Sequence, residues 1–324
     1  MRLPTRTMLP LIAAALAFLT AMAQAQTGAG RPIRVVAPFA SGGGTDTVAR
    51  TLAQKMSERG RLMIVENRPG ANGIVAAEVV MKSPPDGYTL FIADSGHFAI
   101  NPNLRQKLPY DPLRDFTPVI EAVDTHLCLT VGADFPGKSL ADFVALSKSR
   151  PDGLMYGSPG NGSPHHLAME LLRVMSGAKL THVPYKGSAQ AVPGLLAGDV
   201  AALFAGTSST LALVKAGRLR LLAVASEKRA SFLPGVPTVA ESGYPEYEVH
   251  NTIGLLAPAG TPADVVRGLN LGLVQVLKLP ETIARLTDMG MDVVAGTPEQ
   301  FGQSIRRQLE QYARLVKISG AKAD

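Results

Sequence analysis

Residues 33–58 have the sequence IRVVAPFASGGGTDTVARTLAQKMSE, and this stretch decides the fold. The first five residues, 33–37, are mostly branched and apolar, which is typical of a short buried strand. Glycines at 42–44 interrupt that pattern. From about Thr45 to Glu58 apolar side chains recur every four positions, at Val48, Leu52 and Met56. This period predicts an amphipathic helix, so the stretch predicts a strand, a glycine-rich loop and a helix in direct succession.

The same alternation continues along the chain. We expect further strands at 62–66, 89–93, 127–131, 154–156, 181–183, 200–204 and 220–225, and helices at 74–81, 139–147, 164–175, 189–196 and 210–215. Residues 262–312 are predicted to be mostly helical. Alternating strands and helices imply a parallel or mixed sheet with helices on both faces. The sequence therefore predicts an α/β fold.

Length and two intervening segments predict two domains. The 324 residues are enough for two domains of ordinary size. We interpret 117–124 and 247–254 as crossovers, which predicts a discontinuous first domain at 26–122 plus 249–324 and a second domain at 123–248. In open α/β sheets ligands bind beyond the carboxyl ends of the strands. We therefore expect a ligand cleft between the domains, lined by loops that follow strands.

Residues 1–25 have the composition of a secretory signal peptide. Arg2 and Arg6 precede an apolar run at 9–19, and small residues at 21–25 favour cleavage after Ala25 or Ala23. The apolar run is too short for a transmembrane span. A membrane-anchoring helix is the alternative. We expect cleavage and a soluble, exported mature chain; the resemblance described below implies that it acts in the periplasm.

Charge and cysteine content exclude several partners. The net charge is +6, and it falls to +4 without residues 1–25, which contain two arginines and no acid. No basic run is present, so we expect no nucleic-acid binding. Cys128 is the one cysteine, which excludes an internal disulfide and a multi-cysteine metal site.

Four predicted strand-to-helix loops share a composition rich in Gly, Ser, Thr and Asn. They span residues 41–46, 158–163, 185–188 and 206–209. Glycines let backbone N–H groups approach a ligand, and a helix N-terminus favours a carboxylate or another small anion. Helix capping by Ser163, Ser188 and Ser209 is the simpler alternative for each loop. Four such loops together favour a binding cleft.

Longer strings in the sequence resemble a known family. They are PFASGGGTD at 38–46, VENRPGANG at 65–73, PDGYT at 85–89, LPYDP at 108–112, YGSPGNGS at 156–163, HLA at 166–168, HVPYKG at 182–187 and LPGVPT at 233–238. In order and content they resemble the Bug family, periplasmic solute receptors of the tripartite tricarboxylate transporter type. The resemblance implies a two-domain type II periplasmic binding-protein fold that closes on a small carboxylated solute.

The resemblance implies that residues 39–46 and 158–163, with Ser95 and His97, face the ligand, and the composition of the other loops adds further candidates. Family members hold the carboxylate largely through backbone amides, hydroxyls and ordered water, which agrees with the neutral loops. The candidate ligand-binding residues are Phe39, Ser41, Gly42, Gly43, Gly44, Thr45, Asp46, Ser95, His97, Ser158, Gly160, Asn161, Gly162, Ser163, His166, Tyr185, Lys186, Gly206 and Thr207.

Three positions depart from the family pattern. Ser41 replaces a common proline, and residues 251–253 lack an aromatic residue that is often found there. Residues 205–207 are Ala-Gly-Thr, where many members have an Asp or Asn pair. An acid there would suit a ligand amine, so its absence puts amino-acid ligands in doubt.

Residues 132–139, GADFPGKS, match the phosphate-loop pattern G-x-x-x-x-G-K-[ST]. Pro136 removes a backbone N–H that a phosphate cradle needs, and Ser139 with Asp142 predicts a capping box instead. We therefore do not expect nucleotide binding.

The sequence contains no convincing metal or catalytic group. Adjacent His165 and His166 diverge by about 100° on a helix, so a zinc site with His182 is disfavoured. No nucleophile elbow or triad order is present. We expect a monomeric, non-enzymatic receptor without metal or cofactor, which captures a small carboxylate for transporter membrane subunits. The alternatives are an exported enzyme acting on a carboxylate and a sensory or interaction module.

Overall fold

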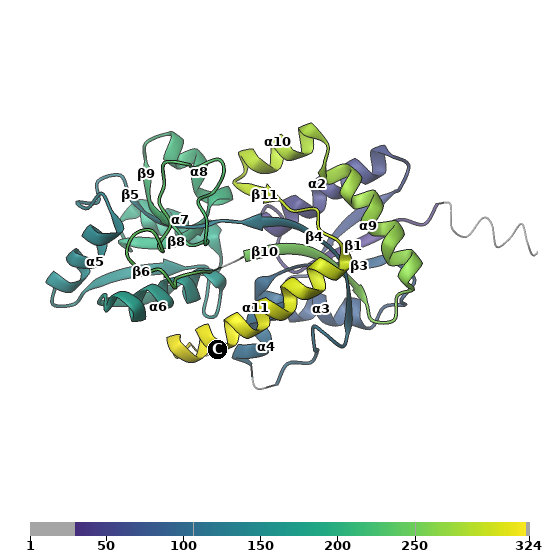
Figure 1. Cartoon of the computed structure of the whole chain (residues 1–324), viewed down its shortest axis with the longest axis horizontal. Helices are drawn as coiled ribbons and strands as arrows, with labels where there is room; N and C mark the ends of the chain where they lie inside the picture. The colour runs from purple at the N-terminus through teal and green to yellow at the C-terminus, as the bar shows by residue number, and fades with distance from the viewer. Residues whose placement is uncertain (1–29, 106, 250, 322–324) are drawn as a thin grey trace, which may run out of the picture.

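The computed structural model describes residues 30–105, 107–249 and 251–321. The predicted signal peptide at 1–25 lies outside these ranges. Figure 1 shows two lobes side by side, each built around one sheet. We call the lobe with the six-stranded sheet the first lobe and the lobe with the five-stranded sheet the second lobe. Within the described ranges, no helix combines the length and the apolar character that crossing a membrane requires.

The sheet of the first lobe takes strands from both halves of the chain. Its order is β11-β4-β10-β3-β1-β2, and β1, β2 and β3 are parallel while β10 runs antiparallel to β3 and β4. The bounds are β1 Ile33–Ala37, β2 Met63–Asn67, β3 Thr89–Asp94, β4 Phe116–Thr125, β10 Asn251–Pro258 and β11 Met291–Val293.

Helices cover both faces of this sheet because successive residues of β1 point to opposite sides. Val35 and Ala37 pack with one set of helices, and Val36 packs with the other. The first set is α2 (Gly44–Glu58), α9 (Ala263–Leu277) and α10 (Pro280–Asp288). The second is α3 (Ile74–Met81), the π-helical turn η2 (Gly96–Ile100), α4 (Asn101–Leu104) and α11 (Pro298–Ser319). A short 3₁₀ turn, η1 (Ala71–Gly73), precedes α3.

The second lobe repeats this three-layer arrangement. Its sheet has the order β7-β6-β8-β5-β9, with β6, β7 and β8 parallel and β5 antiparallel to β8 and β9. The strands are β5 Leu127–Gly132, β6 Leu154–Ser158, β7 Leu180–Pro184, β8 Ala202–Gly206 and β9 Leu219–Val224. The helices are α5 Leu140–Ser149, α6 Pro164–Ser176, α7 Ser188–Ala197 and α8 Thr207–Lys215.

The predicted α/β class with mixed sheets is therefore confirmed. The chain passes between the lobes at the two predicted crossovers, and most of each crossover is a strand of the first sheet. β4 and β10 pair antiparallel; β4 leads into the second lobe and β10 returns from it. The tail is not entirely helical, since β11 pairs with β4 between α10 and α11.

Candidate functional site

Loops that follow parallel strands meet between the lobes. Those after β1 and β3 lie at one edge of the first sheet, and those after β6, β7 and β8 lie at one edge of the second. The two edges are in contact: Thr207 Oγ1 donates a 2.6 Å hydrogen bond to the Gly290 carbonyl, and a Cβ built on Gly44 would lie 3.8 Å from Ser208 Oγ. We call these facing loops the interlobe site.

Three helices that start at this site lack a side-chain cap, whereas α6 is capped by Ser163. α2, α7 and α8 begin after Gly43, Gly187 and Gly206, and none of these helices has a side-chain cap hydrogen bond. Away from the site, α5 and α11 begin with complete capping boxes, at Ser139 and Thr297, whereas α9 and α10 also lack side-chain caps. The first N–H groups of a helix have no partner within the helix. At the interlobe site these donors and the positive helix ends are therefore available to an anion. The predicted caps at Ser188 and Ser209 are wrong, because both serines lie within their helices.

Asp46 holds the first loop in place. Its carboxylate accepts hydrogen bonds from the Gly42 N–H, Arg50 Nε and Asn67 Nδ2 at 2.8–2.9 Å, and the residue is 2% exposed. Burial acts to raise the pKa of Asp46, but the hydrogen bonds from Arg50, Asn67 and Gly42 outweigh it and lower this pKa below 3.8. The loop residues 41–43 remain exposed above this anchor.

Ser95 and His97, which were expected to face the cleft, are buried, and His97 contacts the first loop. Ser95 Oγ donates to Gln308 Oε1 at 2.5 Å and accepts from the Thr252 N–H at 2.9 Å. His97 is 1% exposed and places Nδ1 2.7 Å from Asp94 Oδ1. Its ring contacts Phe39 at a centroid distance of 5.3 Å. In the described structure, His97 Nε2 has no hydrogen-bond partner.

The second loop is held by stacked imidazole rings. Ser158 Oγ lies 2.7 Å from His182 Nε2, and the His166 ring stacks on the His182 ring at 4.1 Å. His166 Nδ1 accepts a hydrogen bond from the Gly162 N–H. Ser163 caps α6, as predicted, by accepting from the His166 N–H at 3.2 Å. His166 and Ser158 therefore shape the loop from behind, while Gly160, Asn161 and Ser163 are half-buried.

The remaining candidates divide between exposed and buried positions. Lys186 is exposed and donates its N–H to Gln190 Oε1. Tyr185 is half-buried, with its hydroxyl against Gly194. Thr45 is buried in the first turn of α2, and Thr207 is 1% exposed because its side chain binds the opposite lobe.

Comparison with known proteins identifies the family. The family model described as tripartite tricarboxylate transporter family receptor matches residues 48–321. The chain belongs to this receptor family. Protein BugT of Bordetella pertussis is 34% identical over 310 residues, which are 95% of each chain. A protein from Pseudomonas sp. (strain P51), encoded in the tcbD-tcbE intergenic region, is 35% identical over 88% of this chain and 85% of its own.

Solved structures of similar proteins share the fold of this receptor-family chain. An R. palustris protein solved with adipate is 35% identical, with a TM-score of 0.85 over 90% of this chain and 98% of that one. MatC from Rhodopseudomonas palustris, with bound malate, is 32% identical, with a TM-score of 0.80 over 89% and 99%. The periplasmic binding protein BugD is 34% identical, with a TM-score of 0.82 over 91% and 99%. The predicted two-domain periplasmic binding-protein fold and the Bug resemblance are confirmed.

The sequence prediction missed one residue of this receptor at the interlobe site. His165 is the second residue of α6, and its buried Nδ1 has no hydrogen-bond partner in the described structure. Burial lowers the pKa of His165 to about 4, although the Asp94 carboxylate of the first lobe opposes this. The imidazole is therefore neutral at pH 7. The sequence pointed to the adjacent His166 instead, because His166 lies in the segment 166–168 that resembles the family and His165 does not.

The phosphate-loop match in this receptor is a helix cap. The N–H groups of Lys138 and Ser139 both donate to Asp142 Oδ2, at 2.8 and 3.0 Å. The predicted capping box is confirmed. Within the described ranges, no three His, Cys, Asp or Glu residues are placed to hold a metal ion. Cys128 is buried, and burial raises the pKa of its thiol to about 12.

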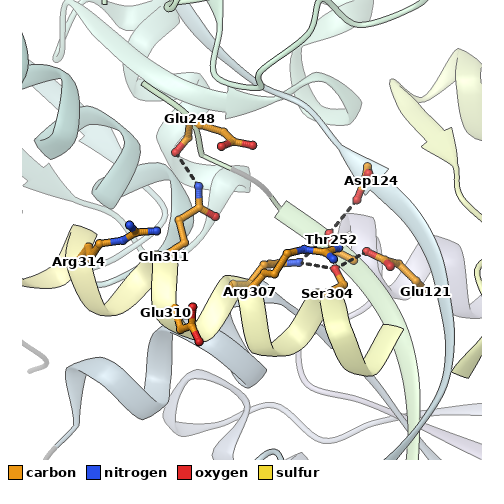
Figure 2. A pocket seen from close by; sticks show the side chains of 10 residues that line it. Glu121, Asp124, Glu248, Thr252, Ser304, Arg307, Glu310, Gln311 and Arg314 are labelled. Atoms are coloured by element: carbon orange, nitrogen blue, oxygen red, sulfur yellow. Dashed lines mark hydrogen bonds between the residues drawn. The ribbon is translucent and has the colours of Figure 1, made fainter. Parts of the chain in front are cut away.

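Two cavities lie away from the interlobe site. One, of about 350 Å³, separates α11 from β4 and β10 (Figure 2). Figure 2 shows its side chains bonded to one another: Ser304 donates to Glu121, and Thr252 donates to Asp124. The other, of about 410 Å³, lies between the 112–118 segment and the starts of α9 and α11. No candidate ligand residue lines either cavity. The first cavity therefore belongs to the polar network that joins α11 to the sheet.

Proposed function

We propose that this chain is a periplasmic receptor that captures a small carboxylate between its lobes and delivers it to a tripartite tricarboxylate-type transporter. The uncapped starts of α2, α7 and α8 at the interlobe site carry this proposal. Apart from the Thr207 N–H, which donates to the His126 carbonyl, the first N–H groups of these helices have no partner within the helix and no fixed cation beside them, which suits reversible capture of a carboxylate. The adipate and malate named with similar structures support this ligand class.

We further propose how the lobes divide the work. Residues 26–122 and 249–324 act as one domain and 123–248 as the other. After removal of residues 1–25, the chain acts in the periplasm as a monomer. The solute contacts the exposed or half-buried candidates of the loops, and His165 joins them. Four candidates lie behind the solute-facing surface, because they are buried and most of their polar atoms bond to other protein groups. They are Asp46, Ser95, His97 and His166. No residue is assigned a catalytic role.

A thermal-shift screen tests the receptor function. The panel contains adipate, malate, citrate and acetate, with ATP for comparison. A ligand at 100 times its Kd stabilises the native state by about 2.7 kcal/mol. For a chain of this size that raises Tm by about 5 °C. At least one carboxylate should produce this shift. A shift with ATP alone would overturn the proposal.

Gly43→Leu tests the loop assignment. A Cβ at Gly43 meets no atom within 4 Å, and the backbone there has φ −79°, so the fold should tolerate the change. The leucine side chain would fill the space above the α2 N–H groups and abolish the ligand-induced shift. Gly235→Leu is the matched control, because Gly235 is equally unobstructed on an exposed loop. Normal binding by Gly43→Leu would refute the assignment.

A further inference from the structure

Two contacts join the lobes at the interlobe site through side chains that are buried and bonded to the opposite lobe. The first is the hydrogen bond from Thr207 Oγ1 to the Gly290 carbonyl. Gly290 has φ +76°, and a Cβ there would lie 2.0 Å from Thr207 Oγ1. Only glycine therefore fits at this position without displacing the threonine. The start of α8 rests directly on the backbone of the turn before β11.

The second contact is centred on Asp292 in β11. Its Oδ2 lies 2.8 Å from His126 Nε2, and its Oδ1 accepts a 2.8 Å hydrogen bond from Ser231 Oγ. His126 Nδ1 lies 3.1 Å from Ser226 Oγ, whose own proton goes to the Lys228 carbonyl. His126 and Ser231 therefore both bond to the one carboxylate of Asp292, and this joins the segments on either side of the second sheet to β11.

These contacts share one anchor in the first lobe. Residues 290–292 accept bonds from α8, from the junction between β4 and β5, and from the segment after β9. The Thr207 N–H also donates to the His126 carbonyl at 3.2 Å, which connects the two contacts within the chain. We call Thr207, His126 and Ser231, together with Gly290 and Asp292, the interlobe clamp.

We infer that the interlobe clamp holds the lobes in the position in which solute is captured, and that Thr207 and Asp292 are positioning residues rather than solute ligands. This inference rests on the proposed receptor function. When only part of a protein population is in the binding-competent arrangement, the apparent Kd rises in inverse proportion to that part. A weaker clamp should therefore lower affinity without any loss of solute contacts.

Thr207→Val tests the clamp, because valine keeps the shape and removes the hydroxyl. Loss of one buried hydrogen bond should raise the apparent Kd for adipate or malate about five- to tenfold. Thr207→Ser restores the hydroxyl and should bind within about twofold of wild type. Thr210→Val is the matched control. Thr210 is buried on the same helix, but its hydroxyl bonds to Gly206 within the second lobe. It should bind like wild type.

Small-angle scattering separates the clamp from the receptor function. Without solute, Thr207→Val and Asp292→Asn should have a larger radius of gyration than wild type and Thr210→Val. If wild type binds neither carboxylate, the receptor proposal is in doubt, and the scattering still decides whether the clamp holds the lobes. If Thr207→Val keeps both the wild-type radius and the wild-type affinity, the clamp is refuted while the receptor function stands.

Discussion

Asp46→Asn tests how the first loop is positioned. One carboxylate accepts three hydrogen bonds, from the Gly42 N–H, Arg50 and Asn67. An asparagine offers one acceptor oxygen and one NH₂ group, so in either orientation its NH₂ faces a donor. Rotating the Asn67 amide does not help, because Asn67 Oδ1 already accepts from Arg50. Losing one hydrogen bond to a charged group costs about 1.5–3 kcal/mol.

The cost should appear in both stability and binding. The expected loss corresponds to a Tm about 3–6 °C below wild type. Solute affinity should fall about tenfold or more, because the N–H groups of residues 42–46 lose their fixed position. The folded-state pKa of Asp46 is lowered, so its stabilisation is present above pH 3.8 and is lost as pH falls through the folded value. The difference between wild type and variant should therefore shrink below pH 4.

Glu58→Gln is the control for this experiment. It removes a carboxylate from the same helix, where Glu58 forms an exposed pair with Lys55. Exposed pairs contribute little, so we expect neither Tm nor solute affinity to change. Calorimetry and titration with the carboxylate found in the thermal screen measure both quantities. If Asp46→Asn matched Glu58→Gln in Tm and in affinity, the loop would not depend on the carboxylate and the reasoning would be refuted.

Three further predictions concern stability and solute contact. Gly73→Ala should destabilise the protein by about 2–4 kcal/mol, because Gly73 has φ +83° and the new Cβ would lie 2.1 Å from the His97 ring. Gly268→Ala, unobstructed within α9, should stabilise it by about 0.5–1 kcal/mol. Equal denaturation midpoints for the two variants would contradict both expectations. Because the folded pKa of His165 is about 4, the free energy of unfolding of wild type should fall by up to about 3 kcal/mol as pH falls from 6.5 to 4. His165→Asn lacks that titration, so parallel curves of unfolding free energy against pH for the two proteins would contradict a lowered pKa of His165. His165→Leu should weaken carboxylate binding about tenfold, while His165→Asn keeps a polar group near Nδ1 and should weaken it less; equal Kd values would remove His165 from the site.

The fold was predictable where an element is an apolar run with clear breaks in the sequence. Residues 33–37 and 74–81 were assigned with the bounds that the structure has, because Pro38 follows the first run and Gly73 precedes the second. β11 was missed because three residues carry no period, and it exists through pairing with β4. The crossovers at 117–124 and 247–254 were predicted as connections but not as strands, because β4 and β10 pair only once both ends of the chain have folded together.

The site was predictable as loops but not as individual side chains. Sequence placed the glycine-rich turns at helix starts correctly, since glycine and serine determine local geometry. The role of each side chain depends on distant partners. Ser95 bonds to a residue 213 positions away, and Thr207 to one 83 positions away. No local pattern contains those partners, so both residues were expected to face the solute.

Residues that are bonded within the protein and residues that are exposed at the facing loops should contribute differently to the choice of solute. Asp46, Ser95 and His166 are committed to hydrogen bonds within the protein, so changing them alters stability and affinity together. Ser41 and Ser208 are exposed at the facing edges, where no packing depends on them. Substitutions at these two serines should therefore change which carboxylate binds while leaving Tm unchanged. Because backbone N–H groups recognise any carboxylate, discrimination between solutes comes from side chains that face the solute, such as these serines and His165.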